Sequence, residues 1–213
     1  MSSRKDSACC QDGSILECPL SQDKGRLKIM KSQDIVILLK LALLYQGDSA
    51  RDMPGHGVAE ASSARGLERS LGISKSEVNA SINRSADAGL LIKDRKSGIP
   101  KANISALLEL ILHGLKYVFP VKPGALVRGM PTAAAAPVMQ GALKSMGEHI
   151  YVWSDPQGEE MGQELKPLFK SVPHAARHDL ELYDLLALVD AIRLGNPRES
   201  KVAQELLEQR LKR

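Results

Sequence analysis

The chain has 213 residues, of which 43% are hydrophobic, 25% are charged and 3% are aromatic. These proportions are typical of a globular protein with one or two domains, and the scarcity of aromatic side chains argues against single-stranded nucleic-acid binding, which depends on stacking. The net charge of +4 and the isoelectric point near 8.9 are compatible with a DNA partner but do not require one.

The N-terminal segment carries no secretory or membrane-spanning signal. Residues 1–30 are polar, which predicts a disordered leader. Its cysteines, Cys9, Cys10 and Cys18, have no histidine nearby to complete a tetrahedral zinc site, so a redox switch and incidental thiols are the alternatives. The longest apolar run, 35–45, is interrupted by a lysine and is too short to cross a bilayer. We therefore expect a cytoplasmic protein without a membrane partner, metal or cofactor.

The first predicted helix follows this leader. Ser32 is expected to cap a helix from Gln33 to Gln46, whose apolar residues recur at helical spacing. Residues 47–62 contain glycine and proline and predict a long polar loop.

The most specific pattern lies in residues 63–79. Leu67, Leu71 and Ile73 are spaced to share one small core, and Gly72 stands where a first helix must end. Ser74 and Glu77 form a capping box, in which the serine side chain accepts from the Glu77 N–H and the glutamate reaches back. This order predicts a helix-turn-helix, whose second helix can enter the major groove of DNA.

The second helix, 75–88, is predicted to bury Val78, Ile82 and Ala86 and to expose a polar face. A hairpin with strands 91–95 and 99–103 follows and forms a basic wing suited to phosphate or minor-groove contact. The predicted DNA contacts are Ser74, Lys75, Ser76, Asn79, Asn83 and Arg84 on the helix, and Lys93, Arg95, Lys96 and Lys101 on wing 93–101.

Residues 32–103, about a third of the chain, resemble the winged helix-turn-helix domain of MarR-like bacterial transcriptional regulators. The matching residues are Leu71-Gly72-Ile73-Ser74, Ser76-Glu77-Val78, Arg84 and Ala88-Gly89-Leu90-Leu91. The resemblance implies double-stranded DNA binding by the second helix and the wing, often as a dimer.

Two positions depart from the MarR-like pattern. Glu68 stands where such motifs usually have alanine, and Ser85 where they usually have leucine. A serine there lies at the edge of the core, so either the helix is slightly rotated or the hydroxyl bonds back to the carbonyl of Ile82 or Ser81.

The second half is predicted to be mostly helical. A helix at 105–118 is apolar around most of its circumference, which predicts burial between two bodies, whereas four prolines mark 120–147 as irregular. Ile150–Trp153 is a predicted strand and 155–158 a turn. Asp179 caps a helix at 180–194 that ends at Gly195, and Asn196-Pro197 begins the last helix.

Few side chains in the second half of the chain suggest a catalytic, metal-binding or phosphate-binding site. His174 and His178 have the spacing of a metal pair, but Pro173 and the shortness of the segment argue against a helix there. Asp190 is expected to pair with Arg193, and His113 to lie in the interior or at its edge. The glycine-containing segment 122–129 lacks the P-loop lysine, which favours a packed loop over a phosphate site.

We therefore predict a mainly α fold with a small β-hairpin wing (α+β). It comprises a leader (1–30), a winged helix-turn-helix domain (31–104), and a helical region with a short hairpin (105–213) for dimerisation or partner binding. The predicted function is a non-enzymatic, sequence-specific DNA-binding transcriptional regulator, a repressor that acts as a dimer. The alternative is a protein-interaction or antitoxin-like module without DNA readout, and an enzyme in residues 120–213 is the third hypothesis.

Overall fold

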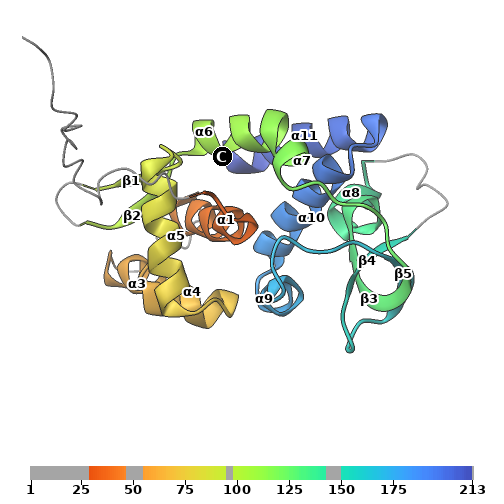
Figure 1. Ribbon diagram of the computed structural model, residues 1–213, viewed down its shortest axis with the longest axis horizontal. Coiled ribbons are helices and arrows are strands. Elements are labelled where there is room, and N and C mark those ends of the chain that lie inside the picture. Colours follow the sequence, from red (N-terminus) through yellow and green to blue (C-terminus); the bar gives the residue numbers. More distant parts are fainter. Residues whose placement is uncertain (1–28, 47–54, 95–97, 143–149, 213) are drawn as a thin grey trace, which may run out of the picture.

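The computed structural model describes residues 29–46, 55–94, 98–142 and 150–212, and the leader cysteines lie outside these ranges. The described chain is mainly helical with two small sheets, which confirms an α+β composition. Two helices, α1 (Ser32–Gln46) and α10 (Leu180–Leu194), occupy the centre, a helical group with a hairpin lies on one side, and a group with a second sheet lies on the other (Figure 1). No described helix is long and apolar enough to cross a membrane.

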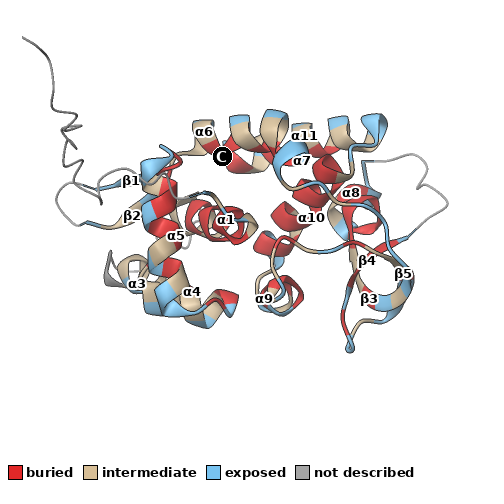
Figure 2. Cartoon of the chain, viewed as in Figure 1, coloured by how far each residue is buried: buried red, intermediate tan, exposed pale blue. Residues whose placement is uncertain are grey.

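Helix α1 is buried along most of its length, because apolar residues cover nearly all of its circumference (Figure 2). It packs against the hairpin group and also against α10 and the last helix. The expected cap at Ser32 is wrong: the helix begins at Ser32, whose hydroxyl donates to the carbonyl of Leu168. Instead, the carboxylate of Asp34 accepts a hydrogen bond from the Lys31 N–H over 2.8 Å.

Two consecutive helices joined by a tight turn form the first group. The predicted loop at 47–62 is wrong for residues 55–61, which form α3 (Gly55–Ala61). Helix α4 (Ala64–Leu71) is capped by Ser63, and Gly72 then adopts a φ of 64° before α5 (Lys75–Asp87) begins. The left-handed conformation at Gly72 is the reason the turn requires glycine. Leu67, Leu71 and Ile73 are buried together as predicted.

The predicted hairpin is confirmed in the described residues. Strand β1 (Leu91–Lys93) pairs antiparallel with β2 (Pro100–Ala102), and Leu91 lies opposite Ala102. Both of these side chains are buried, so the base of the hairpin is anchored in the core.

The predicted helix at 105–118 is present, but its burial was mispredicted. It consists of α6 (Ile104–Glu109), a π-helical segment (Leu110–Gly114) and α7 (Leu115–Val118), and it is capped by Asn103. Only one face is buried, through Leu107, Leu108, Ile111 and Leu115. His113 is exposed, so the helix covers the core from one side.

A small closed barrel of three strands forms the second sheet. Its first strand lies in the segment 120–147 that was predicted to be irregular, whereas the strand predicted at 150–153 is confirmed. Strand β3 (Leu126–Thr132) pairs antiparallel with both β4 (Tyr151–Ser154) and β5 (Glu160–Glu164). The predicted hairpin in this half is wrong, because β4 and β5 are parallel to each other. The predicted turn at 155–158 is confirmed, since the Gly158 N–H donates to the Asp155 carbonyl over 2.9 Å.

Glycines allow this barrel to close. A Cβ atom at Gly129 would lie 2.0 Å from the Trp153 carbonyl oxygen, and one at Gly158 would lie 2.2 Å from the carbonyl carbon of Gly129. Any side chain at these positions would therefore separate the strands. A 3₁₀ turn (Ala133–Ala135) and α8 (Pro137–Gln140) follow β3 and pack on α10.

Helix α10 has the predicted bounds and cap. Asp179 accepts from the Leu182 N–H over 3.0 Å, and Gly195 ends the helix with a φ of 79°. Helices α9 (Val172–His178) and α11 (Pro197–Leu211) cover it together with α1, α7 and the 3₁₀ turn. Most apolar side chains of α10 are thus buried within one chain, although Leu180 at its start is exposed.

The predicted pair of Asp190 and Arg193 is confirmed inside this half. The Asp190 carboxylate accepts from Arg193 over 2.5 Å, and it also accepts from the Trp153 indole over 2.5 Å and the Thr132 hydroxyl over 3.2 Å. These bonds join α10 to two strands of the barrel. Burial raises the pKa of Asp190, while the guanidinium of Arg193 opposes that shift.

Candidate nucleic-acid interface

Helix α5 presents a polar row of exposed side chains. Val78, Ile82 and Ser85 face the core, so the opposite side of the helix is left to solvent. The predicted residues Ser74, Lys75, Ser76, Asn79 and Asn83 are all exposed, as the spacing predicted. The row combines one charged donor with hydroxyl and amide groups, which are the groups that bond phosphates and base edges.

The hairpin extends this row through Lys93. The Lys93 ammonium donates a hydrogen bond to Asn83 Oδ1 over 3.1 Å, which joins β1 to α5. A cleft of about 330 Å³ opens between α5, the hairpin and the junction of α3 with α4. Its described lining residues are Ser62, Ser63, Ala64, Asn79, Ile82, Asn83, Lys93, Gly98 and Pro100.

Arg84 does not belong to the exposed row, and its predicted exposure is wrong. Its guanidinium is buried and binds the carboxylate of Asp34 in α1 with two bonds, from Nε over 2.9 Å and from Nη2 over 2.7 Å. Nη2 also donates to Glu77 over 2.6 Å. Arg84 therefore fixes the position of α5 against α1 rather than facing solvent.

This ion-pair network has clear electrostatic consequences. The hydrogen bond to the Asp34 carboxylate raises the pKa of Arg84, so the guanidinium stays charged. The hydrogen bond from Arg84 lowers the pKa of Glu77, which also accepts from Lys31 over 3.0 Å. Asp34 directly precedes the apolar run of α1, and an acidic residue at the edge of a buried helix was a sequence signal for a buried basic partner.

The predicted capping box at the start of α5 is wrong. The Ser74 hydroxyl makes no capping bond and lies 3.3 Å from the Ser76 hydroxyl, and the Glu77 carboxylate binds Arg84 instead of reaching back to Ser74. The carboxylate of Glu68 replaces the serine and accepts from the Lys75 N–H over 3.0 Å. This bond gives a structural reason for Glu68, the departure from the MarR-like pattern.

The second departure, Ser85, has a different outcome. Its hydroxyl is buried and has no hydrogen-bond partner among the described residues, and the same holds for Ser81 one turn earlier. Of the two alternatives for Ser85, the bond back to a carbonyl is therefore absent. Two buried hydroxyls without hydrogen bonds make the packing of α5 contribute less to the stability of the fold than two apolar side chains would.

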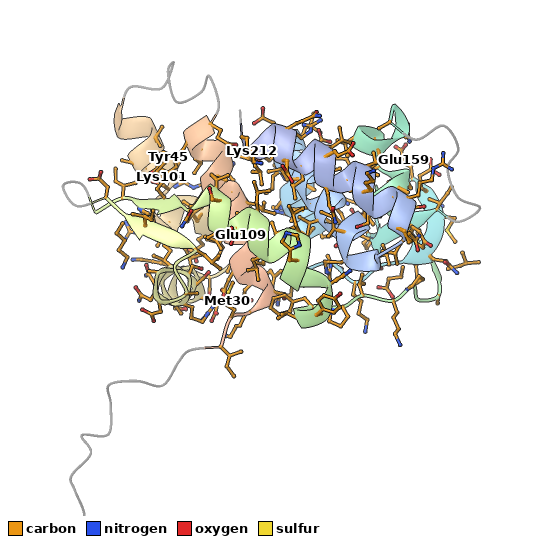
Figure 3. The ribbon with its side chains drawn as sticks, turned by 90° about the horizontal axis from the view of Figure 1, so that it is seen from above. Met30, Tyr45, Lys101, Glu109, Glu159 and Lys212 are labelled. Carbon is orange, nitrogen blue, oxygen red and sulfur yellow. The ribbon has the colours of Figure 1, made fainter. Side chains whose placement is uncertain are left out.

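The remaining wing residues lie apart from the cleft or outside the described chain. Arg95 and Lys96 belong to residues 95–97, which are not described. Lys101 is exposed, but it pairs with Ile92 in the hairpin and so lies on the face opposite Lys93. Its ammonium lies 5.6 Å from the centre of the Tyr45 ring (Figure 3).

Among its described residues, the second half of the chain has no group of polar side chains comparable to the exposed row of α5. The helix that Pro173 made doubtful is present as α9, with the His174 and His178 rings 4.7 Å apart. No group of three or more metal-ligating side chains occurs in the described part of the chain. A groove of about 430 Å³ lies along α11. Its lining residues in the described part of the chain all come from α11, so no second described element forms an opposite wall.

Comparison with protein-family models, curated proteins and solved structures finds no match for this chain. The geometry of α4, α5 and the hairpin is therefore the basis for the proposed function.

Proposed function

We propose that this chain is a sequence-specific double-stranded DNA-binding transcriptional regulator, a repressor with a winged helix-turn-helix fold. In this proposal α5 lies in the major groove, and the hairpin contacts phosphates or the minor groove. The observation that carries the proposal is the exposed row of α5, which continues into Lys93 across one cleft.

The dimensions of α5 suit this role. The helix has 13 residues, so at about 1.5 Å per residue it is roughly 20 Å long, and the major groove of B-DNA is about 12 Å wide and admits such a helix. Lys75, Ser76 and Asn79 lie in its first turns, where base contacts concentrate in helix-turn-helix proteins. The ion pair of Arg84 with Asp34 supports the proposal by holding this row in one orientation.

A second candidate function is a protein-interaction module. Two observations favour it: Arg84 is withdrawn from the surface, and the Glu68 carboxylate occupies the start of α5, where a phosphate would otherwise find unbonded N–H groups. Both reduce the attraction of this face for a polyanion.

Selection of bound fragments from random DNA by the purified chain separates the two candidates. An enriched motif that is lost in Lys75→Ala and kept in Gln209→Ala, an exposed control on α11, supports DNA reading. Retention of no DNA, or of all sequences alike, would refute sequence-specific binding and leave the protein-interaction module.

A further inference from the structure

The two asparagines of the exposed row differ in their hydrogen bonding. Asn79 and Asn83 lie one helical turn apart and line the same cleft. The carbonyl oxygen of Asn83 accepts from Lys93 over 3.1 Å, whereas the Asn79 side chain has no hydrogen-bond partner in the described part of the chain. The amide oxygen is therefore engaged at one position and available at the other.

Lys93 is held where it can maintain this contact. It occupies the last described pair of the hairpin, opposite Pro100. Beyond it, the Asp94 N–H donates to the Ile99 carbonyl over 3.0 Å, and the Gly98 N–H donates back to the Asp94 carbonyl over 2.9 Å. The backbone on both sides of Lys93 is thus fixed, and its side chain extends toward α5.

This difference matters because an asparagine reads adenine with both ends of its amide, accepting from N6 and donating to N7. An ammonium group only donates, so it binds the oxygen of the amide and leaves the two N–H groups for another partner. The amide oxygen keeps a second lone pair, but the ammonium competes with adenine N6 for that oxygen. Donation by the two N–H groups is therefore favoured, and it matches the major-groove edge of guanine, where N7 and O6 both accept.

We infer that Lys93 is a positioning residue that sets the base preference of Asn83, so that Asn83 donates to guanine while Asn79 reads adenine. The inference rests on the proposed DNA-binding function and deepens it. Side chains one helical turn apart are about 5–6 Å from each other, and base pairs rise by about 3.4 Å. The guanine and the adenine therefore lie one or two base pairs apart.

The test compares motifs selected from random DNA by the unmodified chain, by Lys93→Met and by Lys201→Met. Methionine keeps an unbranched stem but cannot donate, and Lys201 is the matched control because it is an exposed lysine on α11, outside the proposed DNA interface. We expect Lys93→Met to reduce the preference for guanine over adenine at the base pair that Asn83 contacts by about fivefold or more, since the freed carbonyl of Asn83 then accepts from adenine. The preference for adenine at the base pair that Asn79 contacts stays unchanged in Lys93→Met, and the whole motif stays unchanged in Lys201→Met.

A double-variant arm assigns the affected position to Asn83. In Asn83→Ala the guanine preference is lost, and adding Lys93→Met changes that position no further. If Lys93→Met weakens binding to all sequences alike and leaves the guanine preference intact, the inference is wrong and Lys93 is only a phosphate contact. If the unmodified chain selects no motif, the proposed function fails together with the inference.

Discussion

The buried pair of Asp34 and Arg84 leads to the most quantitative prediction. The Asp34 side chain is 0% exposed and that of Arg84 is 6% exposed, and two charge-assisted hydrogen bonds join them. In Asp34→Asn one amide oxygen remains to accept, while the NH₂ group faces the guanidinium. The substitution therefore removes one hydrogen bond and the only fully buried countercharge of Arg84 in the described chain.

Breaking a buried ion pair from one side costs about 3–5 kcal/mol of unfolding free energy, because a charge remains buried without its partner. Glu77 stays bonded to Arg84 in this variant, so we expect a loss near the lower limit, about 3 kcal/mol. Globular domains are stable by roughly 5–15 kcal/mol, so this loss is a large fraction of the total.

Urea denaturation followed by circular dichroism measures this loss. Glu208→Gln is the matched control, because its ion pair with Lys212 is exposed on α11 and is worth at most about 1 kcal/mol. The double variant Asp34→Leu/Arg84→Met should recover most of the stability, since apolar residues can replace a buried pair. A loss below about 1 kcal/mol in Asp34→Asn would refute the assignment of this pair as the contact that holds α5 on α1.

Four further predictions concern binding, assembly and pH. Asn79→Ala relaxes the sequence preference and costs roughly 1–3 kcal/mol of binding free energy, and equal selectivity in a fluorescence titration would contradict base reading. Neutralising Arg95 and Lys96 lowers the slope of the logarithm of the DNA-binding constant against the logarithm of salt concentration by about two if both contact phosphates. An unchanged slope would show that neither residue lies in the DNA interface. Light scattering at micromolar concentration tests the predicted homodimer, and a mass of one chain that does not change on concentration would end that hypothesis. Because the fold lowers the pKa of Glu77, its stabilising effect is present above the ordinary value of 4.5 and is lost as the pH falls below it. The midpoint of urea denaturation should therefore fall less in Glu77→Gln than in the unmodified chain as the pH is lowered. Parallel plots of the midpoint against pH for the two proteins would contradict this.

Local signals in the sequence determined several elements correctly. The α4–α5 turn at Gly72, the cap of α10 at Asp179 and its end at Gly195 all depend on interactions between residues a few positions apart. Such interactions are encoded in short stretches of sequence. The exposed row of α5 followed from the same periodicity.

Contacts between distant residues could not be predicted in this way. Arg84 has the spacing of a surface residue, and only the packing of α1 against α5 shows that Asp34 binds it. In place of the expected capping box, Glu68 accepts from the Lys75 N–H, and Glu77 binds that same guanidinium. A buried charge selects its partner by proximity in space, and periodicity alone carries no information about that choice.

The barrel shows the same division between local and tertiary information. Strand β3 contains Pro131, which argues against a strand locally. The proline is tolerated because it lies in the half of β3 that pairs with β4 alone, while β5 pairs with the other half, residues 126–129. The sequence by itself therefore determined where most helices begin and end and which face of α5 is polar. Only the tertiary structure decided that Arg84 is buried, that Lys93 contacts Asn83 and that three short strands close into a barrel, because each of these depends on partners that packing brings together.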